Sequence, residues 1–165
     1  MEIIIRPSQL QDLPAITDVI NYNILHSTAV YDYDIKSEDD VKQWYTNKQS
    51  DGWPVIVAII NNHIAGYATY GTFRYKEGFK YTVEHSVYVS SDYTGKGIGR
   101  LLLSELINKA KQQGYHTMIG CIDASNEGSI AFHKNFGFTE QGILKQSGYK
   151  FGQWLDLLFM QLMLK

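Results

Sequence analysis

The sequence contains little of what builds a disulfide, a zinc site or a membrane span. Cys121 is the only cysteine of the 165 residues, so no intrachain disulfide can form. One cysteine and five scattered histidines do not supply the closely spaced ligands of a zinc site. No apolar run approaches the roughly 20 residues of a transmembrane helix, and the first apolar run is broken at Arg6 and Pro7, unlike a signal peptide. We therefore expect a cytoplasmic protein with no metal and no membrane partner.

The sequence also has no large excess of positive or of negative charge. Lysine and arginine number 15 against 17 aspartates and glutamates, which gives a net charge of -2. This balance lacks the basic excess of a nucleic-acid binder, so no nucleic-acid partner is expected. The hydrophobic content of 44% is too high for a disordered chain. With three prolines and no linker-like segment, residues 1–165 are predicted to form one domain.

Hydrophobic patterns with a strand period alternate along the chain with patterns of a helix period. Strands are predicted at 1–7, 54–60, 63–73, 79–90 and 116–122, with two more within 138–164. Helices are predicted at 8–27, 37–49, 98–113 and 125–137. The resulting order, βααβββαβαββ, predicts a mixed α/β domain.

The stretch "DYTGKGIGRLLL" combines flexibility and positive charge directly before the clearest predicted helix. Gly95, Gly97 and Gly99 stand at alternate positions, and Lys96 and Arg100 lie among them. A helix N-terminus presents unpaired N–H groups, and glycine lets a phosphate approach them closely. The stretch therefore predicts a pyrophosphate cradle, although it matches neither the Walker loop nor the full dinucleotide fingerprint. A purely structural entry into the helix, in a binding module without such a ligand, is the alternative.

Glu84 is a carboxylate in the middle of the otherwise apolar strand "YTVEHSVYV". Such a group is a candidate general base, and the alternative is a solvated residue on an exposed sheet face. His85 must point to the opposite face, so the two side chains are not expected to act on one substrate atom. A core or surface histidine with a satisfied hydrogen bond is the expected role of His85, with an alternative role as the base.

Two longer stretches resemble a known family. "VSSDYTGKGIGRLLLSELINKAKQQG", followed by "NEGSIAFHKNFGF", is similar to the core of the GNAT superfamily of N-acetyltransferases. "YTVEHSVYVS" and "SGYKFGQWLDLLFMQ" resemble its phosphinothricin and methionine sulfoximine/sulfone acetyltransferases, over nearly the whole chain. The resemblance implies the GNAT fold, a mixed, mostly antiparallel sheet flanked by helices. It also implies transfer of acetyl from acetyl-CoA, as co-substrate, to the primary amine of a small amino-acid-like acceptor.

The same resemblance implies a role for each site residue. Glu84 is the implied base, and His133 is the implied acid for the departing CoA thiolate. Arg74 would clamp the acceptor carboxylate, and Tyr31 would line the acceptor pocket beside Glu84. Thr94 stands where the family has arginine or glutamine. Contacts to CoA are implied for the end of the Glu84 strand, the glycine loop and the late helix: Val87, Tyr88, Val89, Thr94, Gly95, Lys96, Gly97, Ile98, Gly99, Arg100, Asn126 and Ser129.

Several alternatives remain open at this point. The acceptor could instead be a polyamine, an aminoglycoside or a protein N-terminus, and the first two would need a pocket faced by the acids of "DYDIKSEDD". A non-catalytic acyl-CoA sensor is another alternative. Direct attack in a ternary complex is expected because Cys121 lies in a later strand, with no nucleophile beside Glu84. Relatives of this kind are commonly homodimers, which the resemblance extends to this chain.

Overall fold

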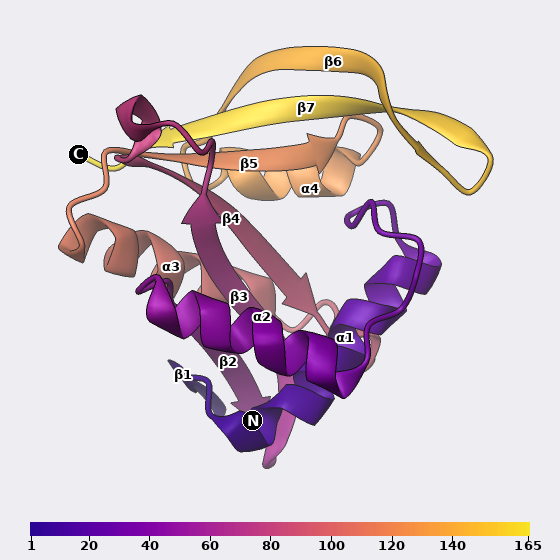
Figure 1. The fold of residues 1–165 in the computed structure, drawn as a ribbon, viewed down its shortest axis with the longest axis vertical. Coiled ribbons are helices and arrows are strands. Elements are labelled where there is room, and N and C mark those ends of the chain that lie inside the picture. Colours follow the sequence, from indigo (N-terminus) through magenta and orange to yellow (C-terminus); the bar gives the residue numbers. More distant parts are fainter.

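Seven strands form one sheet, and four α-helices cover its faces, in a computed structural model that describes residues 1–165 (Figure 1). The predicted order βααβββαβαββ is confirmed. In chain order the elements are β1 (Ile3–Pro7), α1 (Leu13–His26), α2 (Glu38–Ser50), β2 (Val55–Ile60), β3 (His63–Thr72), β4 (Thr82–Val89), α3 (Ile98–Gln112), β5 (Thr117–Asp123), α4 (Glu127–Lys134), β6 (Thr139–Lys150) and β7 (Gln153–Met163).

The strands lie in the order β1-β2-β3-β4-β5-β7-β6, and every neighbouring pair is antiparallel except β4 and β5. The expected mixed, mostly antiparallel sheet is therefore confirmed. The β2–β3 hairpin turns through Asn61 and Asn62, which both have positive φ, as a tight two-residue hairpin requires. None of the helices is both long and apolar enough to cross a membrane.

Alternate residues of each strand pack on opposite faces, as the period of two demands. Val57 and Tyr67 belong to a core with α1 and α2. Ile56 and Tyr70 lie one and three residues from them on the same two strands, so they face the other way and belong to the larger core that contains the apolar stripe of α3. Helices α1 and α2 cover the near face of the sheet in Figure 1, and α3 lies behind it.

The sheet splits between its two parallel strands. β4 pairs with β5 only from Thr82 to Glu84, opposite Thr117 to Ile119. Beyond that point the strands diverge (Figure 1), while β4 stays paired with β3 and β5 with β7. The second half of β4 therefore has one free edge in the middle of the molecule.

The β6–β7 hairpin also holds the connection between α1 and α2 in place. The Lys150 ammonium donates to the carbonyls of Ser27 at 2.6 Å and Val30 at 2.5 Å, which lie just after α1. Tyr33 Oη donates to the Tyr149 carbonyl. These contacts fix the segment that carries Tyr31 against the hairpin.

Candidate active site

The glycine loop has the geometry of an anion cradle. Gly95 and Gly97 have φ of 77° and 78°, a left-handed conformation that favours glycine, and Gly97 is the N-cap of α3. The first helical backbone bond runs from the Leu101 N–H to the Gly97 carbonyl at 3.2 Å, so the N–H groups of residues 95–100 donate to no other group of the protein. Lys96 and Arg100 are exposed beside them. An anion placed there would meet several N–H donors and the positive end of the helix dipole.

The other residues of this region anchor the cradle. Ile98 is buried in the core and fixes the start of α3. Thr94 is exposed, and its hydroxyl lies 3.4 Å from the Ser91 carbonyl. Gly99 faces Val89 and Phe132, since an added Cβ would lie 3.6 Å from each side chain. The cradle therefore lies where the end of β4, the start of α3 and α4 come together.

The free edge of β4 leads directly into this cradle. Val87, Tyr88 and Val89 pair with β3 on one side and have no partner strand on the other. An extended ligand can bind such an edge as an added strand. Across from it, Asn126 caps α4 by accepting the Ser129 N–H at 3.0 Å.

Glu84 has a thiol as its neighbour, contrary to the sequence-based expectation. The Cys121 Sγ–H donates to Glu84 Oε1 at 3.3 Å. The expectation was wrong because it ignored the strand register: Glu84 pairs with Ile119, and Cys121 projects from the same face two residues later. Burial, followed by the charge of Glu84, raises the pKa of the Cys121 thiol to about 12. A thiol that stays protonated is a poor nucleophile.

A cavity of about 250 Å³ brings together the residues predicted to bind the acceptor. Arg74, Tyr31 and Glu84 line it with Cys121, although they come from three separate segments. The Arg74 guanidinium lies 4.4 Å from the centre of the Phe73 ring and makes no ion pair with a carboxylate of the protein. One Nη1–H donates to the Phe73 carbonyl at 2.8 Å, and the other N–H donors of the guanidinium remain to bind a substrate carboxylate.

His133 lies away from this cavity, on the opposite face of the sheet. Its ring stacks on His85 with centroids 5.0 Å apart, and the two Nε2 atoms are 3.0 Å apart. His133 Nδ1 lies 2.7 Å from the Ser129 carbonyl, so it carries the proton, and the Nε2–H donor between the rings is that of His85. Both ring nitrogens of His133 are thus engaged inside the protein. The acid role of His133 stays a prediction.

The opposite orientation of Glu84 and His85 is confirmed, and His85 is a core residue. Its Nε2 is bonded to His133, but its buried Nδ1 has no partner, so the expected hydrogen bonding is only half satisfied. Burial, followed by repulsion from His133, lowers the pKa of His85 to about 3. Burial also lowers the pKa of His133.

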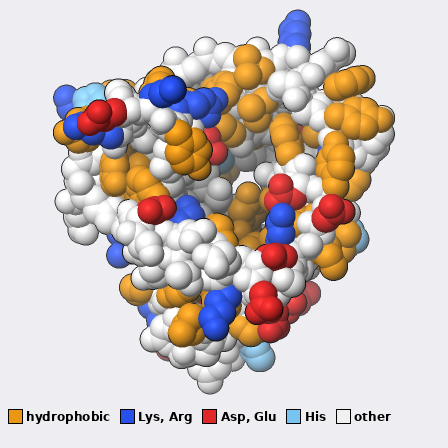
Figure 2. Space-filling view, viewed as in Figure 1, with side chains coloured by type: hydrophobic (Ala, Val, Ile, Leu, Met, Phe, Trp, Pro, Cys, Tyr) orange, Lys and Arg blue, Asp and Glu red, His pale blue; other side chains and the backbone are white.

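The largest cavity near the site, about 710 Å³, lies between the sheet and the α1–α2 connection. Figure 2 shows a hollow in this face with acidic and basic side chains on its rim. Asp32, Asp34 and Asp40 line the cavity, so acids of the "DYDIKSEDD" segment do face it. Asp32 pairs with Lys36 at 3.7 Å, and Asp40 accepts the N–H of Ser37 at 2.8 Å as part of the α2 cap.

A smaller cavity of about 260 Å³ joins this hollow to Glu84. The two cavities share Trp44, Lys48, Thr69 and Ser86. Sequence reasoning missed Lys48, because a lysine in the last turn of a helix is usually a solvated partner of the helix dipole. Only the packing of α2 on the sheet reveals its position.

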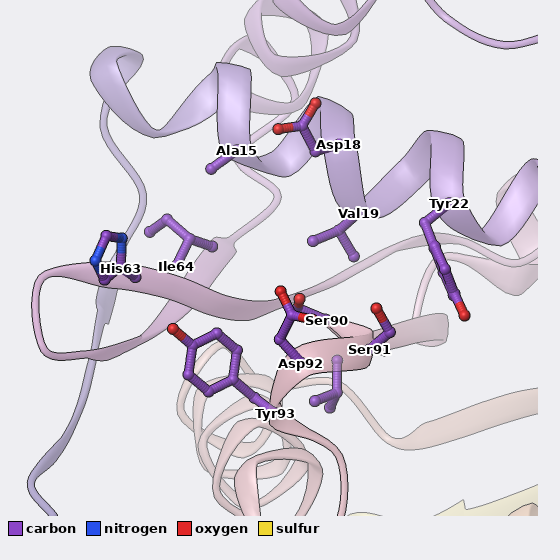
Figure 3. Close-up of a pocket in the computed structure, with 11 residues that line it drawn as sticks. Ala15, Asp18, Val19, Tyr22, His63, Ile64, Ser90, Ser91, Asp92 and Tyr93 are labelled. Atoms are coloured by element: carbon purple, nitrogen blue, oxygen red, sulfur yellow. The ribbon is translucent and has the colours of Figure 1, made fainter.

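A further cavity of about 530 Å³ lies between α1 and the segment that follows β4 (Figure 3). Asp18 and Tyr22 come from α1, His63 comes from the start of β3, and Asp92 follows β4. Of the predicted site residues it contains only Val89. No group of three or more His, Cys, Asp and Glu side chains in the protein is placed to hold a metal ion.

Comparison with known proteins places these features in one family. The family described as "Acetyltransferase (GNAT) family" matches residues 20–138. The L-methionine sulfoximine/L-methionine sulfone acetyltransferase of Salmonella typhimurium is 44% identical, over 97% of this chain and 94% of that protein.

Solved structures agree with this similarity. The N-acetyltransferase of Staphylococcus aureus Mu50 superposes with a TM-score of 0.98, at 43% identity over 100% of both chains. A GNAT superfamily phosphinothricin acetyltransferase of Sinorhizobium meliloti, in complex with acetyl-CoA, superposes with a TM-score of 0.95. It is 35% identical and is matched over 99% of this chain and 89% of that one.

Proposed function

The chain belongs to the GNAT family of acetyltransferases, and we propose that it acetylates the primary amine of a small amino-acid-like acceptor from acetyl-CoA. The acceptor class is phosphinothricin, methionine sulfoximine or methionine sulfone, the compounds named for similar enzymes. The observation that carries this proposal is the cavity in which Glu84 meets Arg74. A carboxylate and a guanidinium in one cavity suit an α-amino acid, which carries an ammonium and a carboxylate on one carbon.

Two surfaces fit acetyl-CoA. The unengaged N–H groups of residues 95–100, with Lys96 and Arg100, suit its pyrophosphate. The free edge of β4 from Val87 to Val89 suits the pantetheine arm as an added strand, and a backbone N–H there would polarise the thioester carbonyl. Asn126 and Ser129 would border the arm from α4. The thioester would then lie between the free edge of β4 and the Glu84 cavity.

Three side chains would act on the acceptor. Arg74 binds its carboxylate through two parallel N–H···O bonds, while Tyr31 forms one wall of the cavity. Glu84 takes a proton from the ammonium group, which leaves a neutral amine able to attack the acetyl carbon. The Cys121 thiol donates to Glu84 and holds its carboxylate in place.

We propose direct transfer in a ternary complex. Cys121 lies beside Glu84, but its raised pKa keeps it protonated and unsuited to carry the acetyl group. His133 is the candidate donor of the proton that the CoA thiolate needs. This role requires the imidazolium form of His133, which its lowered pKa disfavours in the protein without CoA.

We also propose that the protein is a cytoplasmic homodimer without nucleic-acid or membrane partners. The β6–β7 hairpin exposes large hydrophobic side chains that a second copy would cover: Ile143, Leu144, Tyr149, Phe151 and Trp154. Sedimentation analysis of the wild-type protein and of Trp154→Lys would test this. A dimer that the substitution weakens supports the proposal, and a wild-type monomer contradicts it.

A second acceptor class is favoured by one observation. Asp32, Asp34 and Asp40 face the large cavity, which suits an acceptor with a second positive charge, such as a polyamine or an aminoglycoside. Two of these carboxylates already have partners, in Lys36 and the α2 cap, so Asp34 alone is unengaged. We therefore rank this class below the amino acids.

The experiment is CoA release from acetyl-CoA with phosphinothricin, methionine sulfoximine, methionine sulfone, spermidine and an aminoglycoside, each in turn. We expect release with the three amino acids. Release with spermidine or the aminoglycoside alone would replace the amino-acid proposal with the second class. Acetyl-CoA binding without release on any acceptor would contradict both proposals and favour an acyl-CoA sensor.

A further inference from the structure

Lys48 of α2 holds its ammonium group over the sheet, next to Glu84. Its Nζ donates to the Tyr70 carbonyl at 3.0 Å. It lies where Gly71 leaves room, since a Cβ added at Gly71 would come within 2.9 Å of Nζ. Gly71 is paired directly with Glu84 across β3 and β4. Directly opposed residues of an antiparallel pair project from the same face, so Nζ and the Glu84 side chain share the cavity face.

The ammonium has few partners for a charge in this position. Lys48 is half-buried, none of the ion pairs within 4.0 Å includes it, and the bond to Tyr70 is the only hydrogen bond of its ammonium group. Burial lowers its pKa to about 8, because the charges of Asp51 and Glu84 offset the loss of hydration only in part. A lysine has three N–H donors, so two remain for an oxygen atom in the cavity.

Glu84 lies where two cavities meet. One contains Arg74, and the other contains Lys48, and Glu84 is the only residue that lines both. An amino acid whose ammonium lies at Glu84 and whose carboxylate lies on Arg74 has one large substituent left, its side chain. The cavity of Lys48 is the space on the other side of Glu84 that can receive this side chain.

We propose that Lys48 Nζ binds the oxygen atoms of the tetrahedral group at the end of the acceptor side chain, a phosphinate, a sulfone or a sulfoximine. Lys48 is then the residue that makes the enzyme prefer such acceptors over amino acids with apolar side chains. This inference rests on the proposed function, because it assumes an amino-acid acceptor at Glu84 and Arg74. It requires only N–H···O hydrogen bonds and no covalent step.

The test compares Lys48→Met with the wild-type protein on phosphinothricin, methionine sulfone and methionine, the last having no side-chain oxygen. We expect KM for phosphinothricin and the sulfone to rise about tenfold to a hundredfold, since a bond to a charged donor is lost. KM for methionine and for acetyl-CoA should stay within about twofold. Lys48→Arg should restore much of the preference.

Two further variants separate a local effect from a general one. Lys42→Met removes an exposed lysine of the same helix and should change no KM. Gly71→Ala keeps the lysine but displaces Nζ, so it should raise KM for phosphinothricin and the sulfone but not for methionine, and by less than Lys48→Met does. Equal losses of kcat on all three acceptors would overturn the proposal, because Lys48 would then act on Glu84 or on the fold.

Direct binding distinguishes failure of this inference from failure of the proposed function. If the wild-type protein acetylates none of these amino acids, the proposed function fails. Calorimetry of phosphinothricin with the CoA-bound protein then tests Lys48 alone. Binding that Lys48→Met abolishes supports the lysine site, whereas equal binding by both proteins, or by neither, overturns it.

Discussion

Glu84 and His85 are neighbours on β4, yet they lie in opposite surroundings. Glu84 lines two cavities on the α1–α2 face and has a thiol as its donor. His85 is buried on the α3 face against His133 and has one nitrogen without a partner. The strand period of two alone produces this division. One strand at a split in the sheet can therefore place a candidate catalytic side chain on one face and a buried core side chain on the other.

Glu84→Gln should have the largest effect of the substitutions on this strand, and the effect should be on the reaction rate. An amide keeps the shape of the side chain but cannot accept the proton of the acceptor ammonium. We expect kcat for CoA release with methionine sulfone to fall about 10²- to 10⁴-fold. Glu77→Gln, in an exposed turn outside both cavities, is the control. A loss of less than fivefold would show that another group is the base.

Arg74→Met should give the next largest effect, on acceptor binding. The guanidinium offers two parallel donors to a carboxylate, which neither methionine nor lysine can reproduce. We expect KM for the amino-acid acceptor to rise about thirtyfold while KM for acetyl-CoA is unchanged. Steady-state kinetics with each substrate varied in turn checks this, and Arg74→Lys should recover only part of the loss. An unchanged acceptor KM would place the carboxylate elsewhere.

The buried histidines should make the folded state sensitive to mild acid. The pKa of His85 is lowered to about 3, so below the ordinary value near 6.5 the unfolded chain binds a proton that the folded chain does not. The folded state therefore has its full stability with respect to His85 above pH 6.5. This stability decreases as the pH falls from about 6.5 to 3, because protons bind the unfolded chain more tightly. At pH 5 we expect a loss of about 2 kcal/mol in the free energy of unfolding from His85, and His133 adds a loss of the same sign.

Urea unfolding between pH 7 and pH 4.5 measures this slope. His85→Gln removes one of the two titrating groups and can still donate to His133, so its slope should be shallower by about 1.4 kcal/mol per pH unit. Burial raises the pKa values of Asp12 and Asp123, but their hydrogen bonds together outweigh it and lower both, so these carboxylates lose their contributions only at lower pH. An identical slope in both proteins would show that His85 accepts a proton while folded.

Cys121→Ala should give the smallest effect. A thiol is a weak donor, so its hydrogen bond to Glu84 contributes less than about 1 kcal/mol, and kcat should fall by no more than about fivefold. Single-turnover CoA release measures the change. A loss as large as that of Glu84→Gln would mean that the thiol carries the acetyl group, and that transfer is not direct.

Local patterns predicted the elements of the fold and the cradle, because strand period, helix stripe and glycine spacing are read within a few residues. The alternation of Glu84 and His85 followed from the same period. The contact of Cys121 with Glu84 did not, since the two residues are 37 apart in sequence and meet only through the register of β4 and β5. Lys48 was hidden for a similar reason, because its position depends on how α2 packs over Gly71.

His133 shows the other limit of sequence reasoning. Its three- and four-residue spacing from Asn126 and Ser129 is typical of one helix face, and Ser129 does contact both Asn126 and His133. It did not reveal that the partner of this face is His85 in the core, which only the packing of α4 under the sheet determines.

The most direct test measures kcat and the free energy of unfolding, side by side, for Glu84→Gln and His85→Gln. We expect the two substitutions to affect different quantities. Glu84→Gln loses turnover at least a hundredfold and keeps its stability within about 1 kcal/mol, whereas His85→Gln loses stability and keeps kcat within about tenfold. If His85→Gln instead abolishes turnover in a stable protein, while Glu84→Gln remains active, the assignment of chemistry to the Glu84 face of β4 is contradicted.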